Sequence, residues 1–411
     1  MKKQLSVIFM AILMVLSFSN CQKDDVDVPY SKNTIEENKQ IIEEEGLAMF
    51  EKMDGMKNLA GMNAVMDFEM LAYSEPVAYS ARFKAVIDLI DPITKLGKDK
   101  LAIVKLRVSS EEVDAFFTLF GNEAGIYTWN STTNDFDWTE SPDEMTFKYP
   151  SEGSTTNNIT LSVTNLNVSD ATQQTEQPMV TSMDVILKNS GTTLFSLEMT
   201  GRYDEDGLPT NLTTEFEFKE GYTFNQKFSN NGTDAKWDVE YAYKGDNIFK
   251  AHLESAGEFV YDNVVEGDVE DPEYAEKFLD DADAYVQFGN IRLSAVINYE
   301  KLNSSLDETF PQGIGSTEED NLKASDIYNE NVKMCVLFAK ERKAIAKSLF
   351  YAYEYDPELY PGEWDNEVKF VFSDGSSMDA SFFETGFDEL IAAYDDFIME
   401  MQENYNTQIL Y

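Results

Sequence analysis

Alternation of apolar and polar residues between Met183 and Tyr261 restricts the fold of this chain more than any other feature of the sequence. Met183, Val185 and Leu187 share one face of an extended chain, and polar residues occupy the positions between them. A period of two is typical of a strand that is buried on one side. Short turn sequences such as Asn189-Ser190-Gly191 separate the alternating runs. The pattern therefore predicts five or six consecutive strands in a β-meander with one apolar face.

Helical patterns flank the meander on both sides. Thr34 followed by Glu37 forms a capping box and predicts a helix to about Met53. A second, methionine-rich helix is predicted from about Met56 to Tyr73. The remaining predictions are a helix over 79–96, a strand over 101–108, a helix over 110–120, strands between 125 and 168, an acidic helix over 270–285, a strand over 286–299, a helix from Thr317 to about Tyr353, a hairpin of 367–372 with 378–382, and a last helix capped by Thr385.

The apolar face of such a sheet has to be covered, and the flanking helices can cover it. We therefore expect an α+β fold with a large curved antiparallel β-meander sheet, packed against amphipathic helices from the N- and C-terminal regions. Because helices from both ends would share one sheet, we expect a single domain over residues 34–411. Its parts are N-terminal helices over 34–97, a mainly β region over 101–300, and C-terminal helices with the hairpin over 317–405.

Composition argues against several classes of function. The sequence has 76 acidic and 32 basic residues, a net charge of −44, so a basic surface for nucleic-acid phosphates is not expected. The single histidine, His252, argues against multi-histidine zinc sites and histidine-based triads. It alternates with apolar neighbours, so we expect it to be solvent-exposed on a strand. Cys335 is expected to be a buried thiol.

The N-terminus has the features of a secretory signal. Lys2 and Lys3 precede a stretch from Leu5 to Phe18 that is apolar apart from two serines. Such a stretch is too short to cross a bilayer and predicts a signal peptide over residues 1–20. Cys21 stands where cleavage is expected, which predicts lipidation of that cysteine. Residues 21–33 have little apolar content and predict a flexible tether.

The run Cys21-Gln22-Lys23-Asp24-Asp25 resembles the export signal of surface lipoproteins of the Bacteroidota. The resemblance implies that Cys21 carries the lipid and that Gln22, Lys23, Asp24 and Asp25 form the signal. It also implies an outer-membrane, lipid-anchored protein that is exposed at the cell surface, with its body outside the bilayer.

No sequence motif nominates catalytic residues, a cofactor or a metal. The chain lacks the G-x-S-x-G motif, the Walker loop and the Rossmann fingerprint. Three tryptophans near predicted turns, Trp129, Trp138 and Trp364, could stack on sugar rings, or could pack into the sheet edge. The acidic segment 266–283 could supply oxygen ligands for calcium, or could be a solvated helix face. The sequence leaves both choices open.

These observations favour a non-enzymatic surface lipoprotein that binds a ligand or partner and is accessory to nutrient uptake. The partner could be a glycan, an apolar ligand or an outer-membrane protein. The alternative is a carrier of an apolar molecule in a cavity between sheet and helices, because the plan resembles in outline the lipoprotein-carrier half-barrel. A third hypothesis is a hydrolase, which needs two carboxylates roughly 5 to 10 Å apart in a cleft.

Overall fold

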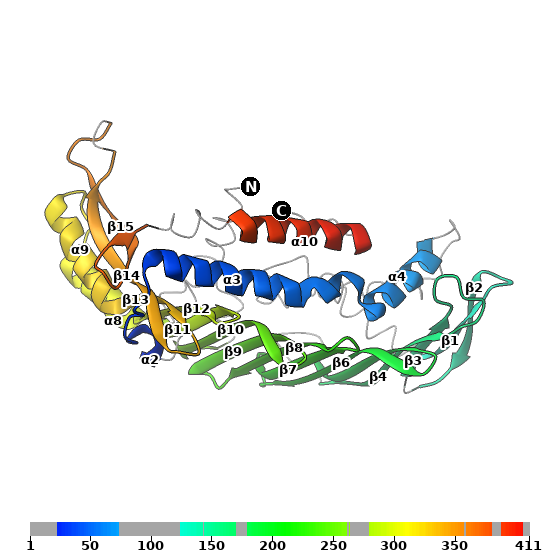
Figure 1. Cartoon of the computed structure of the whole chain (residues 1–411). Coiled ribbons are helices and arrows are strands. Elements are labelled where there is room, and N and C mark those ends of the chain that lie inside the picture. Colours follow the sequence, from blue (N-terminus) through cyan, green and yellow to red (C-terminus); the bar gives the residue numbers. More distant parts are fainter. Residues whose placement is uncertain are drawn as a thin grey trace. The chain divides into compact units, whose positions relative to one another are not determined.

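The computed structural model describes residues 23–73, 124–142, 144–169, 179–260, 263, 279–356, 359–379 and 388–405. These residues form an α+β fold dominated by strands, as the sequence predicted (Figure 1). Contacts divide the chain into two compact units. The first unit comprises Met1–Lys52, Gln226–Ala242 and Asp246–Asp395, and the second comprises Met53–Asn225, Tyr243–Gly245 and Asp396–Tyr411. Each unit is described by itself, and the curvature expected of the sheet stays a prediction.

The strands of the second unit lie in the order β7-β6-β5-β4-β3-β1-β2. Neighbouring strands are antiparallel, except that β1 and β3 pair in parallel. The alternation from Met183 onward predicted the antiparallel neighbours β5, β6 and β7 correctly; in β5, for example, Val185 and Leu187 are buried and the residues on either side of each are half-buried. The strands are β1 (Gly125–Asn130), β2 (Asp135–Glu140), β3 (Glu144–Tyr149), β4 (Ile159–Val168), β5 (Val180–Asn189), β6 (Thr192–Tyr203), β7 (Pro209–Phe218) and the beginning of β8 (Tyr222–Asn230).

Helix α4 (Ala60–Tyr73) covers the apolar face of this sheet, after the short 3₁₀ helix η2 (Asp54–Asn58). Phe68 of α4 is fully buried, with its ring centroid 5.4 Å from that of Phe147 and 5.1 Å from that of Tyr149. The Tyr149 hydroxyl donates a hydrogen bond of 2.8 Å to the Ala64 carbonyl. The sequence thus placed the second helix correctly.

Aromatic side chains fill the neighbouring part of the same core. The Phe195 ring lies 5.7 Å from the Phe216 ring and 5.1 Å from the Phe218 ring, and Phe216 lies 5.7 Å from Phe224. The carrier hypothesis needed open apolar volume beside these phenylalanines. Their side chains instead pack on one another and on α4.

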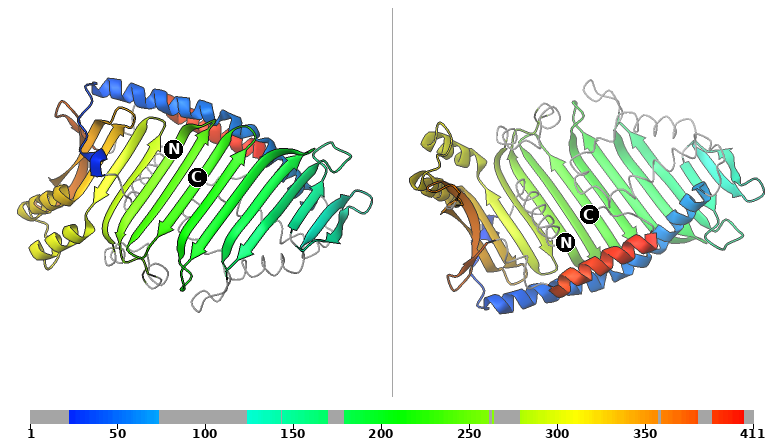
Figure 2. Two further views of the ribbon diagram at one scale, coloured as in Figure 1. Left: turned by 90° about the horizontal axis from the view of Figure 1, so that it is seen from below. Right: turned by 90° about the horizontal axis from the view of Figure 1, so that it is seen from above.

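The first unit contains the remaining strands, which lie side by side in chain order (Figure 2). From β10 to β16, neighbouring strands pair antiparallel. The strands are the end of β8, β9 (Asp234–Tyr243), β10 (Asp246–Gly257), β11 (Leu279–Phe288), β12 (Ile291–Ile297), β13 (Val332–Phe338), β14 (Lys343–Glu354), β15 (Trp364–Val371) and β16 (Ser377–Met378).

Helix α3 (Ile35–Met53) begins with the predicted capping box. The Thr34 amide donates to Glu37 Oε2 at 2.8 Å, and the Glu37 amide donates to Thr34 Oγ1 at 3.2 Å. The beginning of helix α10 (Asp388–Tyr405) contacts α3 within the first unit, where the Phe50 and Tyr394 rings lie 6.0 Å apart. Ile35, Ile41 and Ile42 of α3 pack on a buried cluster that includes Ala284, Leu293, Val336, Ile345 and Phe370.

The predicted helix from Thr317 to Tyr353 is wrong beyond its first part. Thr317 does cap α9 (Glu318–Asn331), since its Oγ1 accepts a 3.2 Å hydrogen bond from the Asp320 amide. The chain then forms β13 and β14, while α8 (Tyr299–Thr309) precedes α9. The physical reason is that the end of β13 is buried on both faces, so it reads as a continuous apolar run without alternation.

The predicted acidic helix over 270–285 is wrong where the structure describes it, because Leu279–Phe288 is strand β11. The predicted strand over 286–299 is in fact the end of β11, a turn at Gly289-Asn290, and β12. The remaining predictions over 79–96, 101–108 and 110–120, together with the signal peptide, lie outside the described residues. No described helix has the length and apolar composition needed to cross a bilayer.

The N-terminal segment differs most from expectation. We predicted a flexible tether over residues 21–33, but α2 (Lys23–Val26) and the residues after it pack on β12 to β14. Val26 and Val28 are each 5% exposed and contact Cys335 and Leu337. The Ser31 amide donates a 2.7 Å hydrogen bond to the carbonyl of Ala344. Two valines and a backbone pairing thus order a segment whose average composition is polar.

The predicted burial of Cys335 is confirmed, and it has a chemical consequence. Its side chain is fully enclosed, and burial raises the pKa of the thiol to about 12. At pH 8 we therefore expect about one thiolate in ten thousand in the native state, against about a quarter in the unfolded chain. Cys335 should resist a thiol reagent until urea unfolds the protein. Fast modification of the native protein would contradict the described packing.

Candidate functional site

The β14–β15 hairpin presents two different faces. Strand pairing places Tyr351 opposite Glu367 and Tyr353 opposite Asp365. Because side chains alternate along a strand, Tyr351, Tyr353 and Tyr355 point to one side, and Phe350 points to the other. In Figure 1 the two strands end in a loop that extends past α9. The hairpin therefore offers an aromatic surface and a separate groove.

The tyrosine face consists of Tyr351, Tyr353, Tyr355 and Tyr360. Tyr355 is 47% exposed and Tyr360 is 49% exposed, with their rings 5.8 Å apart. The Tyr351 and Tyr353 rings lie 6.2 Å apart. Within the described residues, the hydroxyls of Tyr353, Tyr355 and Tyr360 have no hydrogen-bond partner. Large apolar rings with unused hydroxyls at an exposed surface are typical of a recognition site.

Tyr351 differs from the other three because its neighbours fix it. Its hydroxyl donates a 2.7 Å hydrogen bond to Glu367 Oε2, which raises the pKa of Tyr351 to about 12. The Lys369 ammonium lies 4.5 Å from the centre of the Tyr351 ring, within the range of a cation–π contact. One end of the tyrosine face is therefore held in place before any ligand binds.

The other side of the hairpin forms an open groove of about 560 Å³ against α9. Trp364 is half-buried there, and its backbone is held by α9 because Asn321 Nδ2 donates to the Trp364 carbonyl at 3.0 Å. Asn321 also accepts from Asn366 Nδ2, and Ser325 donates to Asn366 Oδ1. The groove is lined by Ile314, Gly315, Ser316, Asn321, Tyr328, Phe350, Trp364, Asp365, Asn366, Glu367 and Val368.

The structure places the three tryptophans singled out from the sequence on three different strands, β1, β2 and β15. Trp129 packs edge-on against Phe136 at 5.3 Å beside the core of the second unit. Trp138 is 38% exposed on β2, a neighbouring strand of the same unit. Trp364 belongs to the first unit. Trp129 is thus a packing residue, and Trp364 is the tryptophan that lies in a groove.

Two carboxylates of β15, Asp365 and Glu367, bear on the hydrolase hypothesis. They lie opposite Tyr353 and Tyr351, so their side chains point to the tyrosine face, while their residues also border the groove. They are two positions apart on β15, so their Cα atoms are about 7 Å apart. Both residues are exposed, and Glu367 already accepts a hydrogen bond from Tyr351. The general acid of a glycosidase is usually enclosed in apolar surroundings. Asp365 and Glu367 are not enclosed in this way, and their exposure suits contact with a ligand better than general-acid catalysis.

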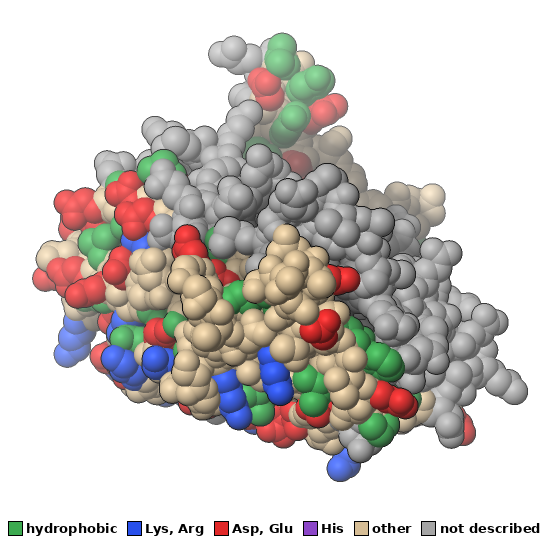
Figure 3. Space-filling view, turned by 90° about the vertical axis from the view of Figure 1, so that its right-hand side faces the viewer, with side chains coloured by type: hydrophobic (Ala, Val, Ile, Leu, Met, Phe, Trp, Pro, Cys, Tyr) green, Lys and Arg blue, Asp and Glu red, His purple; other side chains and the backbone are tan. Residues whose placement is uncertain are grey.

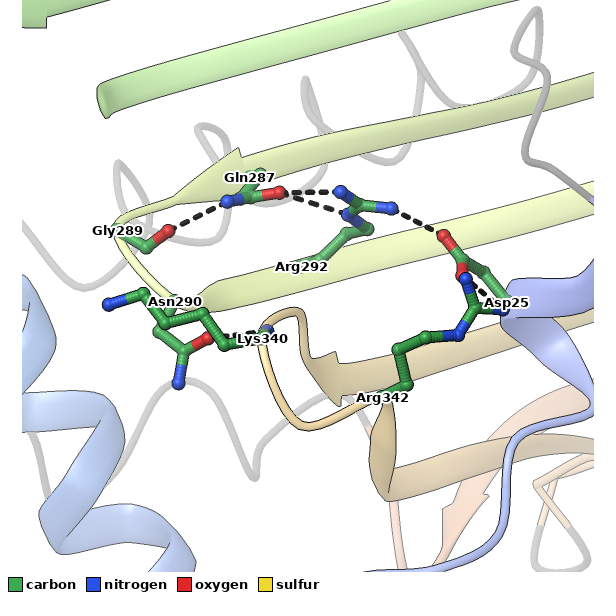
Figure 4. A network of polar contacts seen from close by, with 7 residues as sticks. All are labelled: Asp25, Gln287, Gly289, Asn290, Arg292, Lys340 and Arg342. Carbon is green, nitrogen blue, oxygen red and sulfur yellow. Dashed lines mark hydrogen bonds and ion pairs between the residues drawn. The ribbon is translucent and has the colours of Figure 1, made fainter. Parts of the chain in front are cut away.

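A second polar cluster fixes the N-terminal segment (Figure 4). The Asp25 side chain is 1% exposed and forms ion pairs with Arg292 and, at 3.1 Å, with Arg342. Gln287 Oε1 accepts hydrogen bonds of 3.0 and 2.8 Å from the Arg292 guanidinium. A buried carboxylate is stable only when it is paired, and two arginines supply that pairing.

Of the residues in the predicted lipidation and export signal, some lie outside the described residues and the others belong to α2. Cys21 and Gln22 lie outside the described residues, and Lys23 and Asp24 begin α2. Asp25 is enclosed by the arginines, so its carboxylate is inaccessible in the folded chain. Local sequence patterns could not indicate this role, because the pairing of Asp25 with Arg292 joins residues 267 positions apart.

His252 is buried, at 9% exposure, and the expectation of an exposed strand residue is wrong. Its ring stacks on Tyr285 at 5.3 Å, and its Nδ1 lies 2.6 Å from Asp238 Oδ1. The Tyr285 ring therefore covers His252, which alternation alone predicted to be exposed to solvent.

The calcium hypothesis is largely untested. Most of the acidic segment, residues 266–278, lies outside the described residues, and the remainder belongs to β11. Elsewhere in the described ranges, no group of three or more acidic, histidine or cysteine side chains is arranged to hold a metal ion.

Comparison with known proteins adds no family. No family model, curated protein or solved structure matches the chain.

On the face shown in Figure 3, described acidic and basic side chains are interspersed, and hydrophobic side chains form small separate patches. The functional argument therefore depends on the hairpin and on the N-terminal cluster.

Replacing Asp25 tests the N-terminal cluster. Asp25→Ala leaves two arginines without their shared carboxylate, so we expect a loss of about 2 to 4 kcal/mol in the free energy of unfolding. Urea denaturation followed by circular dichroism measures it. Asp27→Ala is the matched control, because Asp27 is 72% exposed and 3.9 Å from Lys333. The control should change stability by less than about 1 kcal/mol; equal effects of the two substitutions would contradict the assigned pairing.

Proposed function

We propose that this chain is a non-enzymatic, lipid-anchored outer-membrane protein of the cell surface that binds a carbohydrate through the β14–β15 hairpin. The observation that carries the proposal is the exposed tyrosine face, with three unused hydroxyls beside two exposed carboxylates. An accessory role in nutrient uptake follows if the bound carbohydrate is passed to other surface proteins. The proposal does not depend on the curvature predicted for the sheet.

Carbohydrate chemistry fits the tyrosine face better than an apolar ligand does. Side chains two positions apart on a strand are about 6.6 Å apart, so Tyr351 to Tyr355 span about 13 Å. Flat aromatic rings at that spacing can stack on successive sugar rings. Carboxylates such as Asp365 and Glu367 can accept hydrogen bonds from sugar hydroxyls. An apolar molecule would need an enclosed cavity, whereas this surface is open.

Acidic residues in the loop argue against insertion of the hairpin into a membrane. The loop exposes Leu359 at 70%, yet the stretch from Glu354 to Asp365 contains five acidic residues and no basic one. Anionic lipid would repel such a loop. A carbohydrate or a protein surface is the better partner.

The N-terminal segment supports a short connection between anchor and binding site. The Lys347 ammonium lies 5.4 Å from the Tyr30 ring, so the beginning of β14 contacts the N-terminal segment. From Lys347, β14 extends about 26 Å to Tyr355. The hairpin would therefore hold its ligand at a fixed distance from an acyl chain on Cys21.

Substitutions in the hairpin test the carbohydrate proposal. We expect the protein to bind at least one glycan on an array of bacterial, plant and host polysaccharides. The double substitution Tyr353→Ala/Tyr355→Ala should weaken that binding about tenfold or more, because it removes two stacking rings. Calorimetry with the identified glycan measures the change. Trp138→Ala is the control and should leave affinity within about twofold.

Two results would contradict the proposal. Unchanged affinity in the tyrosine variant would place the glycan elsewhere. Absence of glycan binding, combined with capture of a protein that the tyrosine variant no longer captures, would favour a protein partner for the same face.

The lipid anchor has its own test. Intact mass of the protein from its native membrane should show loss of residues 1–20 and addition of acyl chains at Cys21. Cys21→Ser should release the protein from membranes, since each buried CH₂ contributes about 0.8 kcal/mol to attachment. Protease treatment of intact cells should remove the domain. An unmodified Cys21, or a domain that survives the protease, would overturn the anchor or the surface location respectively.

A further inference from the structure

We propose that the β13–β14 turn lies against phosphate headgroups of the leaflet that holds the anchor. The basic turn is defined as Lys340, Glu341, Arg342 and Lys343. The inference rests on the lipid anchor proposed above, and goes beyond it by assigning a second, electrostatic contact between the folded body and the membrane.

Covalent reach is the first argument. Lys23, where α2 begins, is two positions along the chain from Cys21, so their Cα atoms are at most about 7 Å apart. The chain from Asp25 to Ser31 is packed on β12 to β14. A lipid on Cys21 therefore brings the membrane surface close to whatever surrounds α2.

The basic turn belongs to these surroundings. Arg342 of the turn pairs with Asp25 of α2 at 3.1 Å, and the Ala344 amide donates to the Pro29 carbonyl at 3.0 Å. Asn290 fixes the other side of the turn, since its Oδ1 accepts a 2.8 Å hydrogen bond from the Lys340 amide (Figure 4). The turn and the N-terminal segment thus form one rigid element.

Local charge is the second argument. The chain as a whole has a net charge of −44, but Val332–Lys347 contains five basic residues and one acidic residue. Lys333, Lys340, Arg342 and Lys343 are all exposed. Lys340 and Lys343 have no ion-pair partner among the described residues. This reversal of charge occurs next to the point where the anchor would leave the fold.

Nearby acidic groups are mostly paired. The Asp25 carboxylate is occupied by Arg292 and Arg342. Glu341 accepts a 2.9 Å hydrogen bond from Asn290 Nδ2, and Asp27 faces Lys333 at 3.9 Å. Asp24 of α2 is a further acidic residue of this region, and Lys23 precedes it. The lysines of the turn are therefore the charges that remain for an external anion.

The large negative charge of the chain does not prevent such a contact. At physiological ionic strength the Debye length is about 8 Å, so acidic residues farther than that from the leaflet are largely screened. Charges within that distance decide the interaction, and a basic cluster beside an anchor is attracted to anionic lipid.

Labelling of lysines on vesicles tests the inference. The mature-length chain, Cys21–Tyr411, is coupled through Cys21 to a maleimide phospholipid; the enclosed Cys335 does not compete. One vesicle sample contains phosphatidylcholine alone, and the other also contains phosphatidylglycerol. An impermeant amine reagent and peptide mass spectrometry then report each lysine. We expect Lys340 and Lys343 to react at least about threefold more slowly on the anionic vesicles, and high salt to remove the difference.

Internal references and variants sharpen the result. Lys227 and Lys301 are exposed elsewhere in the first unit and should react equally on both vesicles. In Lys343→Glu, protection of Lys340 in the same turn should fall, because the substitution replaces a basic charge by an acidic one. The matched variant Lys227→Glu has the same charge change and should retain the protection.

Two results would overturn the inference. The lysines of the turn could react equally fast on both kinds of vesicle, or Lys227 and Lys301 could be the lysines that react more slowly on the anionic vesicles. Because the anchor in this experiment is synthetic, the outcome is independent of natural acylation. Absence of acyl chains on the native protein would overturn the proposed anchor, whereas an acylated protein with an unprotected turn would overturn this inference alone.

Discussion

The ion pairs of the buried Asp25 carboxylate are the interaction on which the N-terminal part of this structure depends. A carboxylate at 1% exposure is tolerated because Arg292 and Arg342 both contact it. Their side chains come from β12 and from the turn before β14, so the pairing joins the N-terminal segment to a distant part of the first unit. When Asp25 is paired with the two arginines, Val26 and Val28 can cover Cys335 and Leu337. Without the pairing, the buried charge of Asp25 would oppose that packing.

The two faces of the sheet in the first unit are covered in different ways. Helix α3 buries one face through its isoleucines, over the cluster that contains Phe370. The N-terminal segment covers part of the other face, and Tyr30 reaches across it to donate a 3.3 Å hydrogen bond to the Val371 carbonyl. Beyond Tyr30 along β14, the tyrosine face is half-buried at Tyr351 and Tyr353 and exposed at Tyr355. The N-terminal segment and the tyrosine face thus lie along the same strand, β14.

The sequence predicted the parts of the fold that local patterns encode. Alternation from Met183 onward predicted β5 to β10, and the boxes at Thr34 and Thr317 predicted where α3 and α9 begin. The prediction failed at β13 because the end of that strand is buried on both faces and lacks alternation, and the helix predicted there was extended through β14. It failed at residues 25–31 because their order comes from contacts with residues more than 260 positions away.

The candidate site was predicted only in part. Trp364, which the sequence nominated as a ligand contact, lies in the groove, and that role stays a prediction; the tyrosine face was missed. Its signal was present in the sequence, since Tyr351, Tyr353 and Tyr355 recur at a period of two. Assigning this stretch to a helix concealed that period. Trp129 could not be separated from Trp364 by sequence, because only packing against Phe136 distinguishes them.

Hydrogen–deuterium exchange of the mature-length chain tests the central claim that the N-terminal segment is part of the folded body. The Ser31 amide donates to the Ala344 carbonyl, and the Ala344 amide donates to the Pro29 carbonyl. We predict that peptides covering residues 25–33 exchange as slowly as those from β13 and β14, and that Asp25→Ala accelerates both. Complete exchange of residues 25–33 within seconds, with β13 and β14 still protected, would show a flexible tether and contradict the account.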